Sequence, residues 1–281
     1  SETPVVVVDV MRAGPSTGIA TKSEQSDLNI AIYGLHGDAP HLVLAPNSIA
    51  DCIFTTQWSM YLAEAMQTPA IVLSDQYLGQ ARSVIDAPAD VTYIARREVN
   101  ENPSEEYRRY ELTANGISPM TIPGTPNGGY VADGLEHNTA GTPSGSDEDR
   151  SAQMDKRLKK VNDFDYGDQW ADISGEGEMA VITWGSTTGV VKEAIARLRD
   201  EGIEDIRLIS LRLLLPVQEE KFEAALSGVK KALIIEQSHT PQFYRYLRAH
   251  YDLPKKVDLF HRAAPLMMRP GEIYIKLKAC Y

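Results

Sequence analysis

Short runs of apolar residues, separated by segments with helical spacing, are what most constrains the fold of this 281-residue chain. Pro4 to Val8, His41 to Ala45 and Ala70 to Leu73 have the length and composition of strands buried on both faces, which are typical of parallel sheets. Between them, the spacing of apolar residues predicts a short helix over 23–33 and a longer helix over 51–66. The sequence therefore predicts a domain in which helices cover a parallel sheet.

The same alternation returns in the C-terminal part of the chain. Strands are expected over Met179 to Trp184, Ile206 to Ser210 and Ala232 to Glu236, and helices over Val190 to Glu201 and Gln218 to Leu226. This pattern predicts a second parallel sheet, so we expect an α/β protein with two parallel-sheet domains.

A long irregular arm, from about residue 96 to residue 166, joins the two sheets. Because its Gly, Pro and Asn content provides little core, we expect another subunit to order it, and we expect disorder over Gly141 to Asp149. A basic helix over Ser151 to Val161 is interpreted as a solvated face or a subunit contact. The predicted domains are residues 1–166, which include the arm, and residues 167–281.

Charge and cysteine content exclude several classes of protein. The formal net charge of −11 disfavours binding to nucleic acid or to an anionic membrane, and it would repel another acidic protein. Cys52 and Cys280 are the only cysteines and have no CxxC spacing, so the chain cannot supply an iron–sulfur cluster or a four-ligand zinc site by itself. The sequence has neither an apolar run of membrane-spanning length nor a secretory signal pattern, which indicates a cytoplasmic protein.

The beginning of the chain is unusual for a parallel sheet. Ser-Glu-Thr-Pro leads directly into the first strand, without an initiator Met and without a preceding crossover helix. We therefore expect that further sequence precedes residue 1.

The segment Asp9 to Asp27 carries the most informative chemistry. It follows a predicted strand, at the position where open α/β sheets place their ligand crevice. Arg12 supplies a cation, and a Gly-Pro-Ser-Thr-Gly turn brings hydroxyls at Ser16, Thr17 and Thr21. A guanidinium with neighbouring hydroxyls suits a carboxylate ligand. The alternative is that Arg12 forms a structural ion pair and that the hydroxyls cap the turn.

Two further elements are weaker candidates. Glu136 and His137 either line the same crevice from the arm or fix the arm itself, and we favour the second interpretation. The turn over Trp184 to Gly189 precedes a predicted helix but lacks the GK[ST] ending and the GxGxxG spacing of phosphate-binding loops. We therefore expect this turn to cap the helix.

Several motifs occur in the order found in one enzyme family. MRAGPSTGIATKSEQSDL at residues 11–28 is followed by YGLHGDAP at residues 33–40, and the likeness continues through SPMTIPGTPNGGYVADGLEHN, MDKRLKKV, ITWGSTTGVVKEAI and LISLRLLLPV. Together they resemble the α subunits of 2-oxoacid:ferredoxin oxidoreductases, most closely the 2-oxoglutarate synthase branch, over nearly the whole chain. One departure is Ala13, where many relatives have a second glycine.

The resemblance implies a fold, a reaction and site residues. The two sheets are expected to be part of a thiamine pyrimidine-binding domain and a transketolase C-terminal-like domain. Arg12 matches the arginine that holds the 2-oxoacid carboxylate, and Thr21 matches a threonine that also faces the substrate. The implied reaction converts 2-oxoglutarate and coenzyme A to succinyl-CoA, carbon dioxide and reduced ferredoxin.

The resemblance also implies cofactors and partners. Thiamine diphosphate is the expected cofactor, and the glutamate that activates it in the family lies upstream of residue 1. Mg²⁺ and a [4Fe-4S] cluster are expected mainly in a partner β subunit, with ferredoxin and a second copy of the chain as further partners. The competing interpretations are another thiamine enzyme, such as the β-type half of a 2-oxoacid dehydrogenase, and a non-catalytic assembly subunit.

Overall fold

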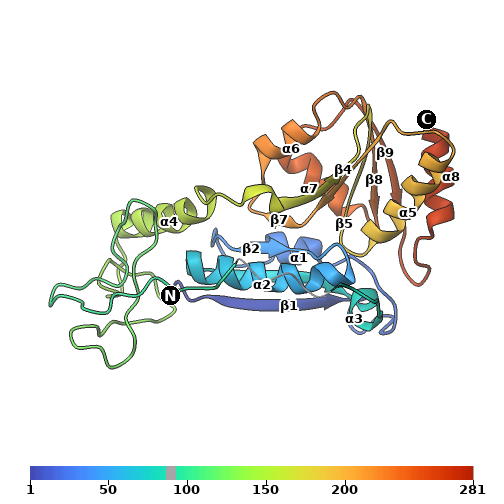
Figure 1. Ribbon diagram of the computed structural model, residues 1–281. Helices are drawn as coiled ribbons and strands as arrows, with labels where there is room; N and C mark the ends of the chain where they lie inside the picture. Colours follow the sequence, from blue (N-terminus) through green and yellow to red (C-terminus); the bar gives the residue numbers. More distant parts are fainter. Residues whose placement is uncertain (87–92, 281) are drawn as a thin grey trace.

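Two mainly parallel sheets, each surrounded by helices, make up the protein (Figure 1). The computed structural model describes residues 1–86 and 93–280. One sheet is built mostly from the N-terminal half of the chain and the other from the C-terminal half. The predicted α/β class with two parallel-sheet regions is therefore confirmed.

The first sheet has the strand order β1-β3-β2-β7. Its strands are β1 (Val5–Met11), β3 (Pro69–Asp75), β2 (Leu42–Leu44) and β7 (Leu213–Leu215). Since β1 and β2 both pair with β3 in parallel, the carboxyl ends of these three strands lie at one edge of the sheet. β7 comes from the C-terminal half and pairs antiparallel with β2, so the two halves of the chain share this sheet. The division at residue 166 stays a prediction.

Helix α2 (Ile49–Met66) covers one face of the first sheet, as the predicted helix over 51–66 requires. Its start is fixed by Ser48, whose hydroxyl accepts a hydrogen bond from the backbone N–H of Asp51. Two short helices follow β1 and β3, namely α1 (Leu28–Tyr33) and α3 (Gln76–Gln80). The helix predicted over 23–33 is thus shorter than expected and begins five residues later, after residues 23–25, which are buried without regular secondary structure, and a turn at 26–27.

β1 is an edge strand, which corrects the expectation that it is buried on both faces. Val5, Val7, Val8 and Val10 are each 47–51% exposed. Within the described part of the chain, β1 pairs with β3 on one side and with no strand on the other. β2 matches its prediction, since its three residues are fully buried.

Contacts within the chain hold part of the irregular arm, and the expectation that another subunit orders it stays a prediction. Arg109 and Tyr110 are both 0% exposed. The Arg109 guanidinium donates to Gln67 Oε1 at 2.8 Å and to the carbonyl oxygen of Ser118 at 3.2 Å. The arm was expected to have little apolar core of its own. A buried cation with polar partners contributes to its order instead.

Helix α4 (Asp147–Asn162) completes the arm and overturns two expectations. The stretch expected to be disordered leads into this helix, and Ser146 caps it by accepting from the backbone N–H of Asp149. Lys156 and Lys160 do not face solvent, because each lies 2.6 Å from a carboxylate oxygen of Glu2 and is less than 5% exposed, whereas Lys159 of the same helix is exposed as expected. Burial alone would raise the pKa of Glu2, but the two lysines outweigh burial and lower that pKa to about 2.

The second sheet has the strand order β4-β6-β5-β8-β9. Its strands are β4 (Ala171–Ser174), β6 (Ile206–Leu211), β5 (Met179–Trp184), β8 (Lys231–Glu236) and β9 (Lys256–His261). The surrounding helices are α5 (Thr187–Asp200), α6 (Glu219–Ala225), α7 (Gln242–His250) and α8 (Pro270–Cys280), with a 3-10 turn, η1 (Gly167–Trp170), before β4. The three predicted strands and two predicted helices are confirmed, whereas the antiparallel β4 and the parallel β9 were not predicted.

Among the described residues, no helix is both long and apolar enough to cross a lipid bilayer.

Candidate functional site

A surface loop over residues 12–22 follows the carboxyl end of β1 and carries the predicted cation. Met11 and Ala13 are each 2% exposed, and the side chain of Arg12 between them points outward and is exposed. Within residues 1–86 and 93–280, Arg12 forms no ion pair and no hydrogen bond. The structural ion pair considered as an alternative is therefore not observed there, and the guanidinium is available to an anion.

The loop is closed on itself at Ala13. The backbone N–H of Ala13 donates to the carbonyl of Lys22 at 2.9 Å, and the carbonyl of Ala13 accepts from the N–H of Ile19 at 2.8 Å. Gly18 adopts a positive φ of 49°, and a Cβ there would lie 1.7 Å from the carbonyl oxygen of Ala13. The closure of the loop therefore requires glycine at position 18 and accommodates the methyl group of Ala13.

The hydroxyls of Ser16, Thr17 and Thr21 lie on this same exposed loop as Arg12. The described structure shows no hydrogen bond from these hydroxyls to the loop backbone, so the capping alternative is not observed. The structure thus brings together four predicted residues whose polar groups face solvent and are free to contact a ligand.

The loop is followed by a buried segment, residues 23–27, that inserts between the two sheets. Ser23, Glu24 and Gln25 are 4%, 6% and 1% exposed. Glu24 accepts from the backbone N–H of His239 at 3.1 Å, beyond the carboxyl end of β8. This end of the second sheet, where α/β proteins commonly bind ligands, is therefore filled by the first half of the chain.

Gln25 makes the most complete contact of that segment. Its Nε2 donates to the carbonyl of Trp184 at 2.8 Å, and its Oε1 accepts from the N–H of Gln237 at 2.8 Å. Its own backbone N–H donates to the carbonyl of Gln237 at 2.6 Å. The side chain thus joins the ends of β5 and β8.

The turn over Gly185 to Gly189 is a contact between the two halves, which corrects the expectation that it caps α5. Ser186 makes no capping hydrogen bond and instead donates to the carboxylate of Asp75. The backbone N–H of Gly185 donates to Oδ1 of Asn47 at 3.1 Å. Burial raises the pKa of Asp75, although its hydrogen bonds oppose the shift. The polar groups of this turn are satisfied by protein partners and are not free for a phosphate.

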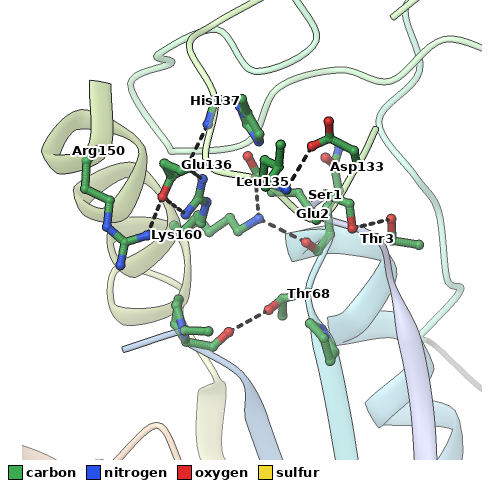
Figure 2. A pocket seen from close by; sticks show the side chains of 16 residues that line it. Ser1, Glu2, Thr3, Thr68, Asp133, Leu135, Glu136, His137, Arg150 and Lys160 are labelled. Carbon is green, nitrogen blue, oxygen red and sulfur yellow. Dashed lines mark hydrogen bonds and ion pairs between the residues drawn. The ribbon is translucent and has the colours of Figure 1, made fainter. Parts of the chain in front are cut away.

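Glu136 and His137 lie in a pocket close to Thr3 and Thr68 (Figure 2), and Arg12 is not among the residues that line this pocket. They line a cavity of about 340 Å³ beside residues that precede or begin the strands, including Thr3, Thr68 and Pro69. The cavity is therefore at the amino ends of the parallel strands.

The contacts of these two residues are with the arm. Glu136 pairs with Arg150 and Arg157, and although burial opposes the shift, these cations lower its pKa to about 2. His137 is 2% exposed, and its ring centroid lies 3.9 Å from that of Tyr110. These contacts fix the arm, as the favoured interpretation of the sequence requires.

The described residues contain no group of three or more His, Cys, Asp or Glu side chains that could hold a metal ion. A diphosphate is commonly bound to proteins through Mg²⁺ and carboxylate ligands. A metal-bound diphosphate would therefore find no cluster of such ligands in the part of the chain that the structure describes.

The sequence did not identify the contacts between the two halves. Gln25, Asn47 and Asp75 come from three separate segments and converge on one turn of the second domain. The sequence did show a run of small and polar residues after each strand. This run indicated a position near a ligand, but it did not indicate which residues of the other half of the chain are contacted.

Comparison with known proteins identifies relatives of the chain. The family described as pyruvate flavodoxin/ferredoxin oxidoreductase, thiamine diphosphate-binding, matches residues 1–156. A 2-oxoacid:ferredoxin oxidoreductase α subunit of Aeropyrum pernix is 37% identical over 89% of this chain and 40% of its own length. A 2-oxoglutarate synthase subunit KorA of Methanothermobacter marburgensis is 30% identical over 99% of this chain and 74% of its own length.

Solved structures give the same picture. A 2-oxoglutarate:ferredoxin oxidoreductase from Magnetococcus marinus, with 2-oxoglutarate, coenzyme A and succinyl-CoA bound, superimposes with a TM-score of 0.90 and 39% identity over 99% of this chain and 49% of that chain. A split-gene transketolase, at 11% identity and a TM-score of 0.50, shares the fold alone. The chain spans about two fifths of the length of three archaeal α subunits that it matches, at 40%, 43% and 39%.

Proposed function

Because the chain belongs to the pyruvate flavodoxin/ferredoxin oxidoreductase family, we propose that it forms the 2-oxoacid-holding part of a thiamine diphosphate-dependent 2-oxoacid:ferredoxin oxidoreductase α subunit. The proposed substrate is 2-oxoglutarate, oxidised with coenzyme A to succinyl-CoA and carbon dioxide while ferredoxin is reduced. The names of the KorA relative and of the Magnetococcus structure support this choice of substrate.

The observation that carries the proposal is the unpaired cation at the end of β1. Because Met11 and Ala13 are buried, the side chain of Arg12 leaves the backbone on the solvent side, and nothing in the described chain neutralises its guanidinium. A 2-oxoacid presents a carboxylate beside its ketone, and a guanidinium can bind that carboxylate through two parallel hydrogen bonds. The hydroxyls of Ser16, Thr17 and Thr21 are available to orient the rest of the substrate.

In the proposed mechanism, Arg12 binds the carboxylate and sets the direction of the carbon–carbon bond that breaks. Thiamine diphosphate, when bound, would supply the nucleophile and the electron sink that decarboxylation of a 2-oxoacid needs. Arg12 attracts the charged carboxylate more strongly than it attracts neutral carbon dioxide, which favours release of the product. Thr21 contacts the substrate from the far end of the loop.

The site is open, which supports a partner subunit. The loop is exposed, and the described chain has no metal-ligand cluster. We therefore propose that a β subunit holds Mg²⁺, the diphosphate and a [4Fe-4S] cluster, and that the complex contains a second copy of this chain. The net charge of −11 opposes direct docking of an acidic ferredoxin here, so ferredoxin is proposed to bind the complex elsewhere, in the cytoplasm.

The test is turnover by the assembled α/β complex with a viologen as electron acceptor. We expect coenzyme A-dependent reduction, with a kcat/KM for 2-oxoglutarate at least about tenfold above those for pyruvate and branched 2-oxoacids. Preference for another 2-oxoacid would change the substrate and keep the reaction class. Transfer of the acyl group to lipoamide, with no viologen reduction, would instead favour a 2-oxoacid dehydrogenase.

A further inference from the structure

The loop over residues 12–22 has two anchors that belong to different halves of the chain. Its first anchor is β1, whose last residue, Met11, pairs with Asp75 of β3. Its second anchor is Gln25, which lies three residues after Lys22, where the loop closes, and is bound to the second sheet. The direction of the loop therefore depends on how the second half is seated against the first.

We propose that Gln25 is a positioning residue for the 2-oxoacid site, because its side-chain amide fixes the loop 12–22 onto the ends of β5 and β8. This inference rests on the proposed function of the loop. It gives the second domain a defined part in substrate binding: that domain holds the loop and touches no substrate.

The receiving surface fits an amide and little else. A donor is required opposite the carbonyl of Trp184, and an acceptor is required opposite the N–H of Gln237. Glutamate would place a second oxygen against the Trp184 carbonyl, and alanine would leave both groups unpaired in a buried site. Glutamine supplies both functions from one side chain.

Gly185 is shaped to receive this amide. Its φ is +63°, and a Cβ built there would lie 2.7 Å from Nε2 of Gln25. Cδ of Gln25 would lie 3.9 Å from the same Cβ, which is an ordinary contact, so the clash is with the amide nitrogen itself. Replacing Gly185 with alanine is therefore a second way to displace Gln25, from the other side of the contact.

A matched control exists elsewhere in the same interface. Arg212 of the second half pairs with Asp51 of α2 at 3.0 Å, and both side chains are 10–12% exposed. Neither partner contacts residues 12–27 in the described structure. Loss of this pair weakens the contact between the two halves without touching the loop.

The experiment compares Gln25→Ala, Gly185→Ala and the control Arg212→Leu in the assembled complex. Hydrogen–deuterium exchange of the loop amides, including those of Ala13 and Ile19, is measured first because it needs no turnover. We expect exchange about tenfold faster in Gln25→Ala and Gly185→Ala, and within about twofold of the parent in Arg212→Leu.

The second readout is the KM and kcat for 2-oxoglutarate. We expect KM to rise about tenfold in Gln25→Ala and Gly185→Ala, with Gln25→Glu also impaired, and to stay within about twofold in Arg212→Leu. Unchanged loop exchange in both test variants, or equal effects in Arg212→Leu, would overturn the positioning role. A parent complex that turns over no 2-oxoacid would overturn the proposed function instead, while the exchange data still decide whether Gln25 holds the loop.

Discussion

The loop after β1 and the turn after β5 occupy the same kind of position, at the carboxyl end of a parallel strand, but differ in their surroundings. In the loop, the guanidinium of Arg12 and the neighbouring hydroxyls face solvent without protein partners in the described structure. In the turn, Gly185 and Ser186 are bound by Asn47 and Asp75. The two segments therefore share a position in which a ligand could bind. The loop after β1 is open because its polar groups have no protein partners in the described structure, and the turn after β5 is filled because its polar groups have them.

Replacing the cation should give the largest effect. In Arg12→Ala, loss of a charge-assisted pairing should cost about 2 to 5 kcal/mol, or about 30- to several thousand-fold in kcat/KM for the 2-oxoacid. Arg12→Lys should recover only part of the activity, because lysine keeps the positive charge but cannot form two parallel hydrogen bonds to the carboxylate. The measurement uses the assembled complex with viologen, and the thermal midpoint should not change, since Arg12 has no protein partner in the described chain.

A substitution in the turn after β5 should lower stability and leave activity nearly unchanged, which is the opposite of the effect expected for Arg12. Thr188 is 0% exposed, and its hydroxyl lies 2.6 Å from that of Ser210. Thr188→Val should lower the free energy of unfolding by about 1 to 3 kcal/mol, because Ser210 loses a buried partner. Urea unfolding measures this loss, with kcat/KM staying within about twofold. A tenfold drop in kcat/KM at unchanged stability would show that the turn takes part in catalysis and would remove the distinction.

Glycine substitutions sharpen the comparison further. Gly18→Ala places a methyl group against the carbonyl of Ala13 in a left-handed backbone and should reshape the loop, at a cost of about 1 to 2 kcal/mol, or about 5- to 30-fold in kcat/KM. Gly189→Ala is the control, because a Cβ there meets nothing within 4 Å inside α5. It should leave kcat/KM unchanged and raise stability slightly. Equal kinetics for the two variants would contradict the fixed shape assigned to the loop.

Thr21→Ala should give the smallest effect. Loss of one neutral hydroxyl contact should lower kcat/KM by about two- to tenfold. Because the hydroxyl is proposed to contact the substrate, the ratio of kcat/KM between 2-oxoglutarate and pyruvate should also shift. An unchanged ratio with lowered activity for both acids would assign Thr21 a role in loop structure only.

Local pattern predicted much of the fold, because strand and helix alternation depends on neighbouring residues. The edge position of β1 and the addition of β7 beside β2 in the first sheet depend on pairing between distant segments, which periodicity does not encode. Order in the arm was missed for a similar reason. It rests on ion pairs such as that of Glu2 with Lys156, which are 154 residues apart.

The site divides in the same way. Arg12, Ser16, Thr17 and Thr21 could be proposed together as site residues because they lie within one short motif. The contacts that hold this motif join distant residues, such as Gln25 with Gln237, which are 212 positions apart. A single sequence carries no signal for such pairs. The polar residues could be recognised, but their partners could not be predicted.

The most direct test of the central claim is the affinity of the assembled complex for 2-oxoglutarate, measured by titration calorimetry without coenzyme A or electron acceptor. If Arg12 binds the carboxylate, the Kd of Arg12→Ala should exceed that of the parent by about 30-fold or more, and Arg12→Lys should lie between them. Thiamine and cluster occupancy must be equal in all three proteins. A Kd for Arg12→Ala within about twofold of the parent would show that another group holds the carboxylate and would contradict the account.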